Sequence, residues 1–476
     1  MNIRLAFRLV ASFALLIGAG SARSAERAID HATMAHLATL GSGESQVVDA
    51  FPAGPSTSAA VRFRRVQVYS PDARIFVVTA AGQSELPRSD RIFLRGYSGD
   101  RSVRVAMSLN ADGSFADGNG SSPEGSFALR GNIDASGAQR LSALPIKDAL
   151  PPGYKYQYRC SNGDLLASAT PSLDMMLKNL GASSATSVAA SAPSPDSLAV
   201  AASSPSPYSL AIVAIDTDSE FMSLLFSNSA ANAATWIAKM FNTMNTMYEP
   251  DLDVQLVQGT TFLRVGTDPY ASANHVPVDD SDVDVFATYW RTNYAGVKRA
   301  FAALLSGRGP CESCGTNCIS CSSSGRAWVN QFCQTGFDFQ GHVVGSYSVE
   351  QVFTNLLVDP NADISARLTG HEIGHNFGAF HTHCTDKNSG MAPVATNTID
   401  QCFKGEAAVG CYGGTVQCPA GGSGTIMSYC NDGGACGTDN LLQFNGTQIS
   451  ATLTPNVAAQ TPACLLSDRI FANGFN

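Results

Sequence analysis

The chain has 476 residues, of which 44% are hydrophobic and 14% are charged, and its formal net charge is -9. This length exceeds what a single hydrophobic core usually serves, so we expect two or three domains. The hydrophobic fraction excludes wholesale disorder and a fibrous repeat. Because an acidic chain without a basic run would repel phosphates, we expect no nucleic-acid partner.

The N-terminus has the layout of a secretory signal peptide. Arg4 and Arg8 precede an apolar run over residues 9–17, and small residues follow it. A membrane-spanning helix needs about 20 apolar residues, and this run is much shorter. We therefore expect residues 1–24 to be removed, the remaining chain to have no membrane span, and the protein to be secreted.

A run of Ala, Ser, Pro and Thr over residues 181–208 divides the chain. Its apolar surface is too small to offset the loss of chain entropy on folding, so we expect a flexible linker. The expected domains are residues 25–180 and 209–466. Residues 467–476 form a tail that resembles short tails on some bacterial exported proteins.

Polar and apolar residues alternate along several stretches of the first domain. This period of two over residues 61–69, 74–79 and 91–97 predicts strands with one buried face. Turn signals at residues 111–113 and 151–153 support the interpretation of a β-rich module.

The second domain opens with the apolar run LAIVAI, residues 210–215, which is typical of a buried parallel strand. The following patterns predict a helix, a strand, a helix, two short strands and a helix: residues 219–248, 254–262, 283–305, 326–332, 343–348 and 364–377. This alternation predicts an α+β fold of layered α/β type, with a mixed, mostly parallel twisted sheet.

The last predicted helix leads into the sequence HEIGHNFGAFH. His371 and His375 are four residues apart on one helical face and can bind one ion, with Glu372 beside it. Gly378 permits a positive φ, which lets the chain turn and bring His381 round as a third ligand. Three imidazoles without a thiolate suit Zn²⁺ and leave a fourth position for water, as in catalytic zinc sites.

These residues resemble the metzincin zinc signature, HExxHxxGxxH. Metzincins also have a methionine-bearing turn beneath the metal, and the sequence TIMSY around Met427 fits it. The form HEIGHNFG resembles the reprolysin (adamalysin) group, and GRAWVNQFC at residues 325–333 resembles the antiparallel edge strand of that group. The resemblance spans about residues 209–466 and implies a metzincin catalytic domain with an active-site helix and a Met-turn.

Two positions depart from the reprolysin pattern. Reprolysins usually have aspartate directly after the third histidine, where this chain has Thr382. Threonine there, with Tyr429 two residues after the methionine, also resembles the pappalysins, so the subfamily stays open. Tyr429 is a candidate extra zinc ligand or transition-state donor, with a packed tyrosine as the alternative.

The motif and the resemblance imply a zinc metalloendopeptidase that acts on proteins or peptides. Zinc lowers the pKa of a bound water, and Glu372 accepts its proton as general base. The edge strand of the family would pair with an extended substrate. One Zn²⁺ is expected, and nothing in the sequence indicates Ca²⁺. The alternative is a catalytically silent binding or adhesion module on the same scaffold; the presence of Glu372 and all three histidines favours the enzyme.

The chain has 13 cysteines, an odd number, so at least one lies outside any intramolecular disulfide. Export favours disulfides over the structural zinc or iron–sulfur alternatives for one closely spaced group: Cys311, Cys314, Cys318 and Cys321. Disulfides are also expected to brace a Gly-rich loop around the Met-turn, through Cys402, Cys411, Cys418, Cys430 and Cys436.

Cys160 precedes all the other cysteines and is the candidate for the odd thiol. A thiolate can take the open zinc position in place of water. The sequence YRCSNGD around it has the Arg and Asp of the matrixin cysteine switch, but not the flanking prolines. We therefore expect residues 25–180 to be an inhibitory propeptide and the chain to be a latent precursor. A free or intermolecularly paired Cys160 is the alternative.

Overall fold

The structure is a computed structural model. It describes residues 25–29, 31–41, 44–54, 56–114, 116–133, 139–149, 155–160, 208–308, 320–352, 359, 361–420, 423–430, 436, 440–460 and 464–467. The expected signal peptide, the linker except Tyr208 and the tail except Ser467 lie outside these residues. None of the helices in the described ranges combines the length and the hydrophobicity that a bilayer span requires.

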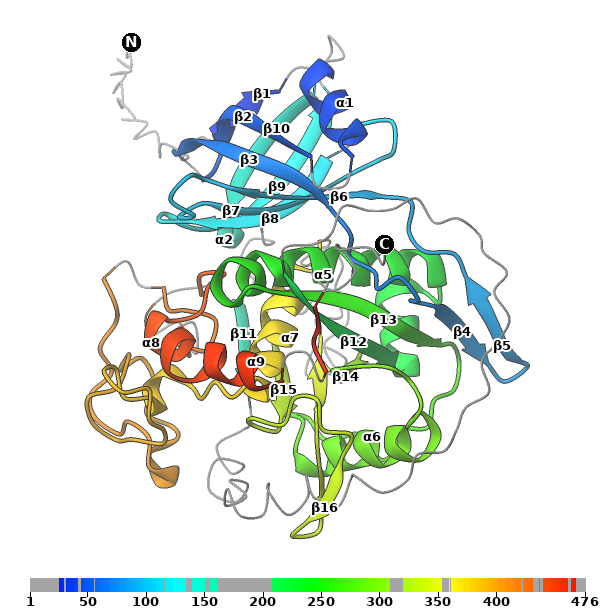
Figure 1. Ribbon diagram of the computed structural model, residues 1–476, viewed down its shortest axis with the longest axis vertical. Coiled ribbons are helices and arrows are strands. Elements are labelled where there is room, and N and C mark those ends of the chain that lie inside the picture. The colour runs from blue at the N-terminus through cyan, green and yellow to red at the C-terminus, as the bar shows by residue number, and fades with distance from the viewer. Residues whose placement is uncertain are drawn as a thin grey trace, which may run out of the picture.

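The N-terminal part is built around an eight-stranded antiparallel sheet, drawn at the top of Figure 1. Its order is β1-β10-β9-β8-β7-β6-β3-β2. The strands are β1 (Ala25–Ala28), β2 (Ser45–Pro52), β3 (Ser58–Val66), β6 (Ile92–Tyr97), β7 (Arg104–Leu109), β8 (Ala116–Ser122), β9 (Gly125–Ile133) and β10 (Gln139–Pro145). Two short helices accompany them, α1 (His31–Thr39) and α2 (Ile146–Ala149). Alternate side chains such as Val61 and Phe63 fill the core of this part, so the strands expected from the period of two are present.

A second sheet has nine strands and takes them from both halves of the chain. The path is β11-β15-β18-β14-β12-β13-β4-β5, and β19 pairs with β12. The strands are β4 (Ile75–Thr79), β5 (Gly82–Leu86), β11 (Lys155–Cys160), β12 (Ser209–Thr217), β13 (Val254–Arg264), β14 (Phe301–Ser306), β15 (Ser320–Ala327), β18 (Tyr347–Gln351) and β19 (Leu466–Ser467). Most neighbouring pairs are parallel, and β15–β18, β4–β5 and β12–β19 are antiparallel. The mixed α+β architecture agrees with the fold class expected from the sequence.

Helices cover both faces of the second sheet. On β12, Val213 and Ile215 pack with α5 (Ala230–Leu252) and α7 (Asp363–Asn376), while Ala214 packs with α6 (Asp280–Asn293) on the other face. The shorter elements are η1 (Phe221–Leu225), β16 (Phe337–Phe339), β17 (His342–Val344), η3 (Thr382–Cys384), η4 (Ala407–Val409), α8 (Gly446–Gln448), η6 (Ile449–Leu453) and α9 (Thr454–Gln460).

Helix α5 lies between the two sheets and joins the N-terminal part to the rest (Figure 1). Arg95 is fully buried and pairs with the buried Glu249, with 2.6 Å between Nη2 and Oε1. Arg104 pairs with Asp251 at 2.7 Å. The Asn242 amide donates to two backbone carbonyls of the first sheet. The charged groups of this interface are therefore paired, because an unpaired charge would be costly to bury.

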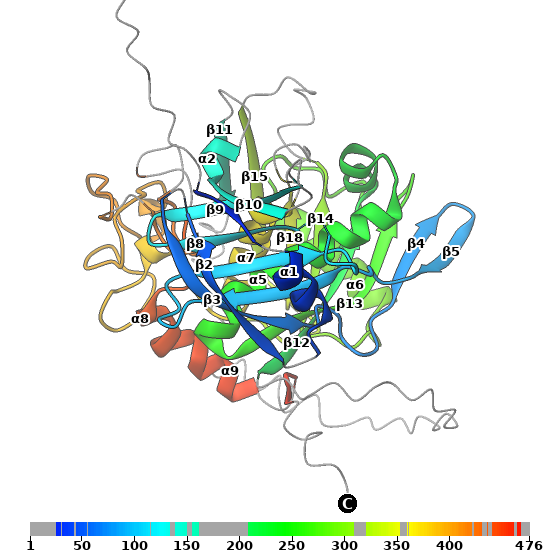
Figure 2. The same cartoon turned by 90° about the horizontal axis from the view of Figure 1, so that it is seen from above.

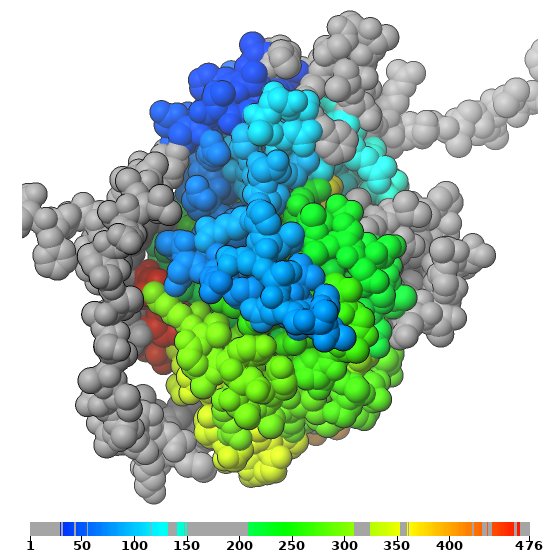
Figure 3. Space-filling view, turned by 90° about the vertical axis from the view of Figure 1, so that its right-hand side faces the viewer, coloured from blue at the N-terminus to red at the C-terminus, as the bar shows by residue number. Residues whose placement is uncertain are grey.

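Strands β4 and β5 extend the second sheet beyond β13. The backbone of Ile75 pairs with Thr261, and the pairing continues to Val78 and Arg264. Figure 2 shows this hairpin projecting from the first sheet, and Figure 3 shows its blue surface lying on the green surface of the C-terminal half. The N-terminal half thus supplies strands at both ends of the second sheet, β11 at one end and β4–β5 at the other.

The expected helix over residues 283–305 is wrong in its second half. Helix α6 ends at Asn293, and Phe301–Ser306 is the central strand β14. The sequence FAALLS is a continuous apolar run, and such a run does not by its periodicity distinguish a buried strand from a buried helix. Because β14 is covered on both faces, it carries no alternation that would identify it.

Other expected boundaries also shift. The helix expected over residues 219–248 is interrupted. Residues 219–226 are helical and contain η1, but Ser227 and Asn228 have positive φ values of 48° and 63°, and α5 begins after them at Ala230. The strand expected over residues 326–332 is β15, which ends at Ala327. The strand expected over residues 343–348 is the end of β17 and the start of β18.

Candidate active site

Helix α7 is buried along its whole length, and a carboxylate fixes its first turn. Asp359 precedes the helix and accepts hydrogen bonds from the backbone amides of Ile364 and Ser365, both at 3.0 Å. These bonds satisfy two of the amides that a helix start leaves without a partner. Burial and the neighbouring Asp363 raise the pKa of Asp359 to about 6. The start of the helix is thereby fixed, and the helix supports the histidines near its other end.

Three histidine rings converge at the C-terminal end of α7. His371, His375 and His381 are all fully buried. Nε2 of His375 is 3.1 Å from Nε2 of His371 and 3.1 Å from Nε2 of His381. The structure therefore brings together the three residues that the sequence proposed as metal ligands, and their ligating atoms lie within 4.8 Å of one another.

The opposite nitrogen of each ring is hydrogen-bonded to an oxygen. Nδ1 of His371 is 2.8 Å from the backbone oxygen of Ile426, and Nδ1 of His375 is 2.7 Å from that of Ala379. Nδ1 of His381 is 2.7 Å from the carboxylate of Glu406. Each Nδ1 must therefore carry the hydrogen, since its partner is an acceptor. The Nε2 atoms of the three rings therefore face one another.

This donor set fits a Zn²⁺ ion. Burial and the neighbouring His381 lower the pKa of His371 to about 3, and burial also lowers that of His375, so these imidazoles are neutral. Facing lone pairs repel unless a cation lies between them. Tetrahedral Zn–N bonds of about 2.0–2.1 Å place ligand nitrogens about 3.3 Å apart, close to the 3.1 Å separations here.

Glycines allow the chain to approach the histidines closely. Gly378 has a φ of 105°, the positive value that the sequence predicted for the turn toward His381. At Gly374, between the two helical histidines, a Cβ would lie 2.8 Å from Sδ of Met427. Met427 is fully buried. The methionine expected beneath the metal therefore packs against α7 where only glycine leaves room.

An aspartate from a later loop supports the segment after the third ligand. The Asp400 carboxylate accepts hydrogen bonds from the hydroxyls of Thr382 and, at 2.7 Å, of Ser428. The backbone amide of Thr382 donates to the Met427 oxygen at 3.0 Å. Where reprolysins carry aspartate directly after the third histidine, this chain combines Thr382 with Asp400. This pairing could not be predicted from the sequence, because the two residues are 18 positions apart.

Tyr429 lies against the ligand histidines. Its ring is nearly parallel to that of His371, with an interplanar angle of 10° and 6.1 Å between the ring centroids. The centroid of its ring is 4.5 Å from that of His381. Phe403 packs edge-on against its other side, at 4.8 Å and 87°. The tyrosine is thus a packed neighbour of two ligands, and a role for its hydroxyl stays a prediction.

Glu372 is fully buried and packs against β15. A Cβ at Gly325 would lie only 2.2 Å from Oε1 of Glu372, so no other residue fits at 325 without displacing the carboxylate. Gly325 is the first residue of the expected edge-strand motif, and β15 pairs antiparallel with β18 as that motif predicted. The carboxylate thus lies between the helix and the strand.

Strand β15 is not at the edge of the sheet in this chain. Strand β11 pairs with its outer side in parallel, and the register places the backbone of Cys160 opposite Gly325 (Figures 1 and 2). The structure describes the backbone of β11 and not its side chains, so the Cys160 thiol is outside what it describes.

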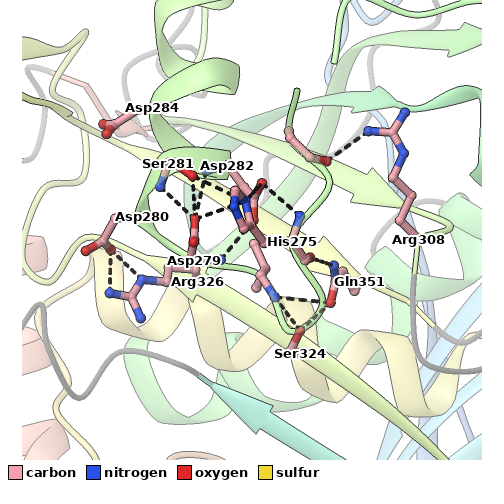
Figure 4. Close-up of polar contacts among 12 residues, drawn as sticks. His275, Asp279, Asp280, Ser281, Asp282, Asp284, Arg308, Ser324, Arg326 and Gln351 are labelled. Carbon is pink, nitrogen blue, oxygen red and sulfur yellow. Dashed lines mark hydrogen bonds and ion pairs between the residues drawn. The ribbon is translucent and has the colours of Figure 1, made fainter. Parts of the chain in front are cut away.

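Polar contacts fix β15 to β18, to the start of α6 and to the loop before it, as Figure 4 shows. Arg326 donates to Asp280 at 2.5 Å. Ser324 donates to Gln351 of β18 at 2.5 Å and accepts from the backbone amide of Val278 at 3.1 Å. The strand beside the candidate base is therefore held on both sides of Gly325.

Two buried carboxyl residues near this site were not predicted. Glu406, described above, has no recognisable spacing to the motif. Glu350 of β18 is fully buried, and its backbone pairs with that of Gly325. Burial and the charge of Glu372 raise the pKa of Glu350 well above its usual value. The only signal in the sequence is a charged residue within an otherwise buried strand.

Disulfides brace the loops around the site. Among the described cysteines the pairs are Cys333–Cys464, Cys384–Cys411, Cys402–Cys430 and Cys418–Cys436. The last three support the expectation that cysteines brace the Met-turn loop. Three members of the closely spaced group lie outside the described residues: Cys311, Cys314 and Cys318. Its fourth member, Cys321, lies in β15.

Comparison with known proteins identifies a family. Residues 206–444, half of the chain, match the reprolysin model described as Metallo-peptidase family M12. No curated protein matches the chain. A solved structure entitled "Structure of a chaperone-substrate complex" aligns at 13% identity with a TM-score of 0.24, over 38% of this chain and 28% of that one, which is too little to bear on the fold. The family match and the histidine motif it contains show that the chain belongs to metallopeptidase family M12, as a reprolysin-like metzincin.

Proposed function

We propose that the protein is a secreted zinc metalloendopeptidase that is made as a latent precursor. Membership of family M12 supports the general class of metallopeptidase. The observation that carries the finer proposal is the convergence of three buried imidazoles from a motif that also contains the buried Glu372. A peptidase that activates water needs a carboxylate at this position as proton acceptor, whereas a binding module does not require one.

The roles follow from the chemistry of the side chains. His371, His375 and His381 would hold the metal. A bound Zn²⁺ supplies a Lewis acid that acidifies water and polarises a peptide carbonyl. Glu372, wedged against Gly325, accepts the proton of the attacking water and returns it to the leaving amine. The backbone of β15 binds the substrate as an added strand.

The position of β11 supports latency. Substrate and β11 compete for the same edge of β15, so a bound β11 excludes an extended peptide. The backbone of Cys160 lies opposite Gly325, the residue that contacts the general base. A cysteine thiolate is a strong zinc ligand and would displace the water that the reaction needs. Activation then requires β11 to leave the site.

Hydrolysis of casein by the processed protein, from which the expected propeptide of residues 25–180 has been removed, tests the proposal. We expect hydrolysis that 1,10-phenanthroline abolishes and added Zn²⁺ restores, because the chelator removes the ion that activates water while three disulfides still connect the loops around the histidines. A processed protein that binds zinc and hydrolyses no peptide or protein would contradict the proposal and favour the binding module.

A further inference from the structure

Glu406 lies directly behind the third proposed zinc ligand. Its Oε2 is 2.7 Å from Nδ1 of His381 and 2.8 Å from Nε2 of His383. Both histidines are fully buried, and Glu406 itself is 8% exposed. The carboxylate oxygen of Glu406 therefore lies between two buried imidazole rings.

The three ligand histidines differ in what they donate to. His371 and His375 donate to backbone carbonyls, whereas His381 donates to a carboxylate. A hydrogen bond to an ionised acceptor is roughly twice as strong as one between neutral groups. A carboxylate behind a metal-bound imidazole also raises the basicity of the ring and fixes its tautomer and orientation. His381 gains most from this, because it leaves the helix and lacks the support of α7.

We propose that Glu406 is a positioning residue of the metal site, which holds His381 with its Nε2 lone pair directed at the ion and so strengthens zinc binding. This inference rests on the zinc site proposed above. Glu406 acts through His381 and does not touch the substrate.

Covalent bonds hold the loop that carries Glu406. The disulfides Cys384–Cys411 and Cys402–Cys430 enclose position 406 in the sequence. The backbone oxygen of Glu406 accepts from the amides of Val409 and Cys411. The carboxylate therefore reaches His381 from a loop whose ends are fixed, which a positioning role requires.

A second metal site at the same cluster is the competing interpretation. His381, His383, Cys384 and Glu406 lie close enough together to hold an ion. Cys384, however, is bonded to Cys411 and has no thiolate to offer. Nε2 of His383 and Nδ1 of His381 both point at the same Glu406 oxygen, as hydrogen-bond donors do. The cluster is a hydrogen-bond network behind one metal site.

Zinc affinity of the full chain tests the inference. Glu406→Gln keeps the size of the side chain and removes its charge. We expect its dissociation constant for Zn²⁺, measured by competition with a chromophoric chelator, to rise about 10- to 100-fold. Glu85→Gln is the matched control: it makes the same change at an exposed carboxylate of β5 that pairs with Arg74, so its zinc affinity should equal that of the wild type. Wild-type affinity in a folded Glu406→Gln variant, or equal losses in the two variants, would overturn the inference.

A measurement on the unaltered protein covers the case in which Glu406→Gln does not fold. In the zinc-loaded wild-type chain, the ring Nδ1 proton of His381 should resonate further downfield than those of His371 and His375, because only its acceptor is ionised. A His381 proton no further downfield than the other two would contradict the inference. Neither readout depends on hydrolysis, so a chain that passes both tests and cleaves nothing would overturn the proposed function alone.

Discussion

At the scale of single residues, the site depends on positions that lack a side chain. Gly325 gives Glu372 its place against β15, and Gly374 gives Met427 its place beneath the histidines. The histidines were predictable from the sequence because their spacing is local: four residues along a helix, then one glycine turn. Glu406 and Asp400 were not predictable, because they reach the site from a loop whose position the disulfides and tertiary packing determine.

Gly325→Ala should lower kcat about 100-fold, because its methyl group would displace the Glu372 carboxylate by part of an ångström or more. Peptide hydrolysis by the activated protein measures this. Gly296→Ala is the control, since a Cβ there meets no atom within 4 Å. Unchanged kcat in Gly325→Ala would show that the carboxylate does not work from its position in this structure.

Asp218 should make folding stability depend on pH. Burial raises its pKa to about 7, despite hydrogen bonds from the Gly307 and Phe221 amides and the Ser306 hydroxyl. The folded chain then holds a proton that the unfolded chain releases from about pH 4 upward. This contribution to the free energy of unfolding is complete below about pH 4 and is lost as the pH rises through about 7.

Urea denaturation of Asp218→Asn across this range checks the assignment. The variant should lose part of the fall in unfolding free energy that the wild type shows between about pH 4 and pH 7. A variant with the same pH slope as the wild type would mean that Asp218 is ionised in the folded protein.

At the scale of elements, the best-predicted ones were those with their own periodicity or a motif. Strand β12 and helix α7 lie where the sequence indicated, whereas residues 301–305 were assigned to a helix and belong to strand β14. The pairing of the strands was even harder to predict from the sequence than the strands themselves. Nothing local in residues 75–86 or 155–160 reveals that they join a sheet made mainly of the other half of the chain.

Strand β11 gives a test of latency at this scale. We expect Cys160→Ser to raise the activity of the uncut precursor, because a hydroxyl is a poor zinc ligand and β11, held only by its pairing with β15, would then leave the edge more often. Hydrolysis of a fluorogenic peptide by the intact chain measures it, with Ser102→Ala as a control far from the strand. A Cys160→Ser precursor as latent as the wild type would rule out the thiolate switch.

At the scale of the whole molecule, the two halves are more closely joined than the sequence suggested. The linker over residues 181–208 led us to expect two separate domains. The described residues instead share the second sheet, and Arg95, Arg104 and Asn242 build a polar interface across helix α5. Contacts between segments that are distant in the sequence do not depend on local composition, so they become visible only in the three-dimensional structure. A cut in the linker would therefore leave the N-terminal part bound through α5, β4 and β11.

The central claim is that a zinc site and Glu372 together make this chain a peptidase. Glu372→Gln tests it most directly, by zinc content and peptide hydrolysis measured on the same processed sample. We predict that the variant binds zinc like the wild type, because all three histidines remain, and that kcat falls at least about 100-fold, because the proton has no acceptor. Hydrolysis at the wild-type rate by the zinc-loaded variant would contradict the account.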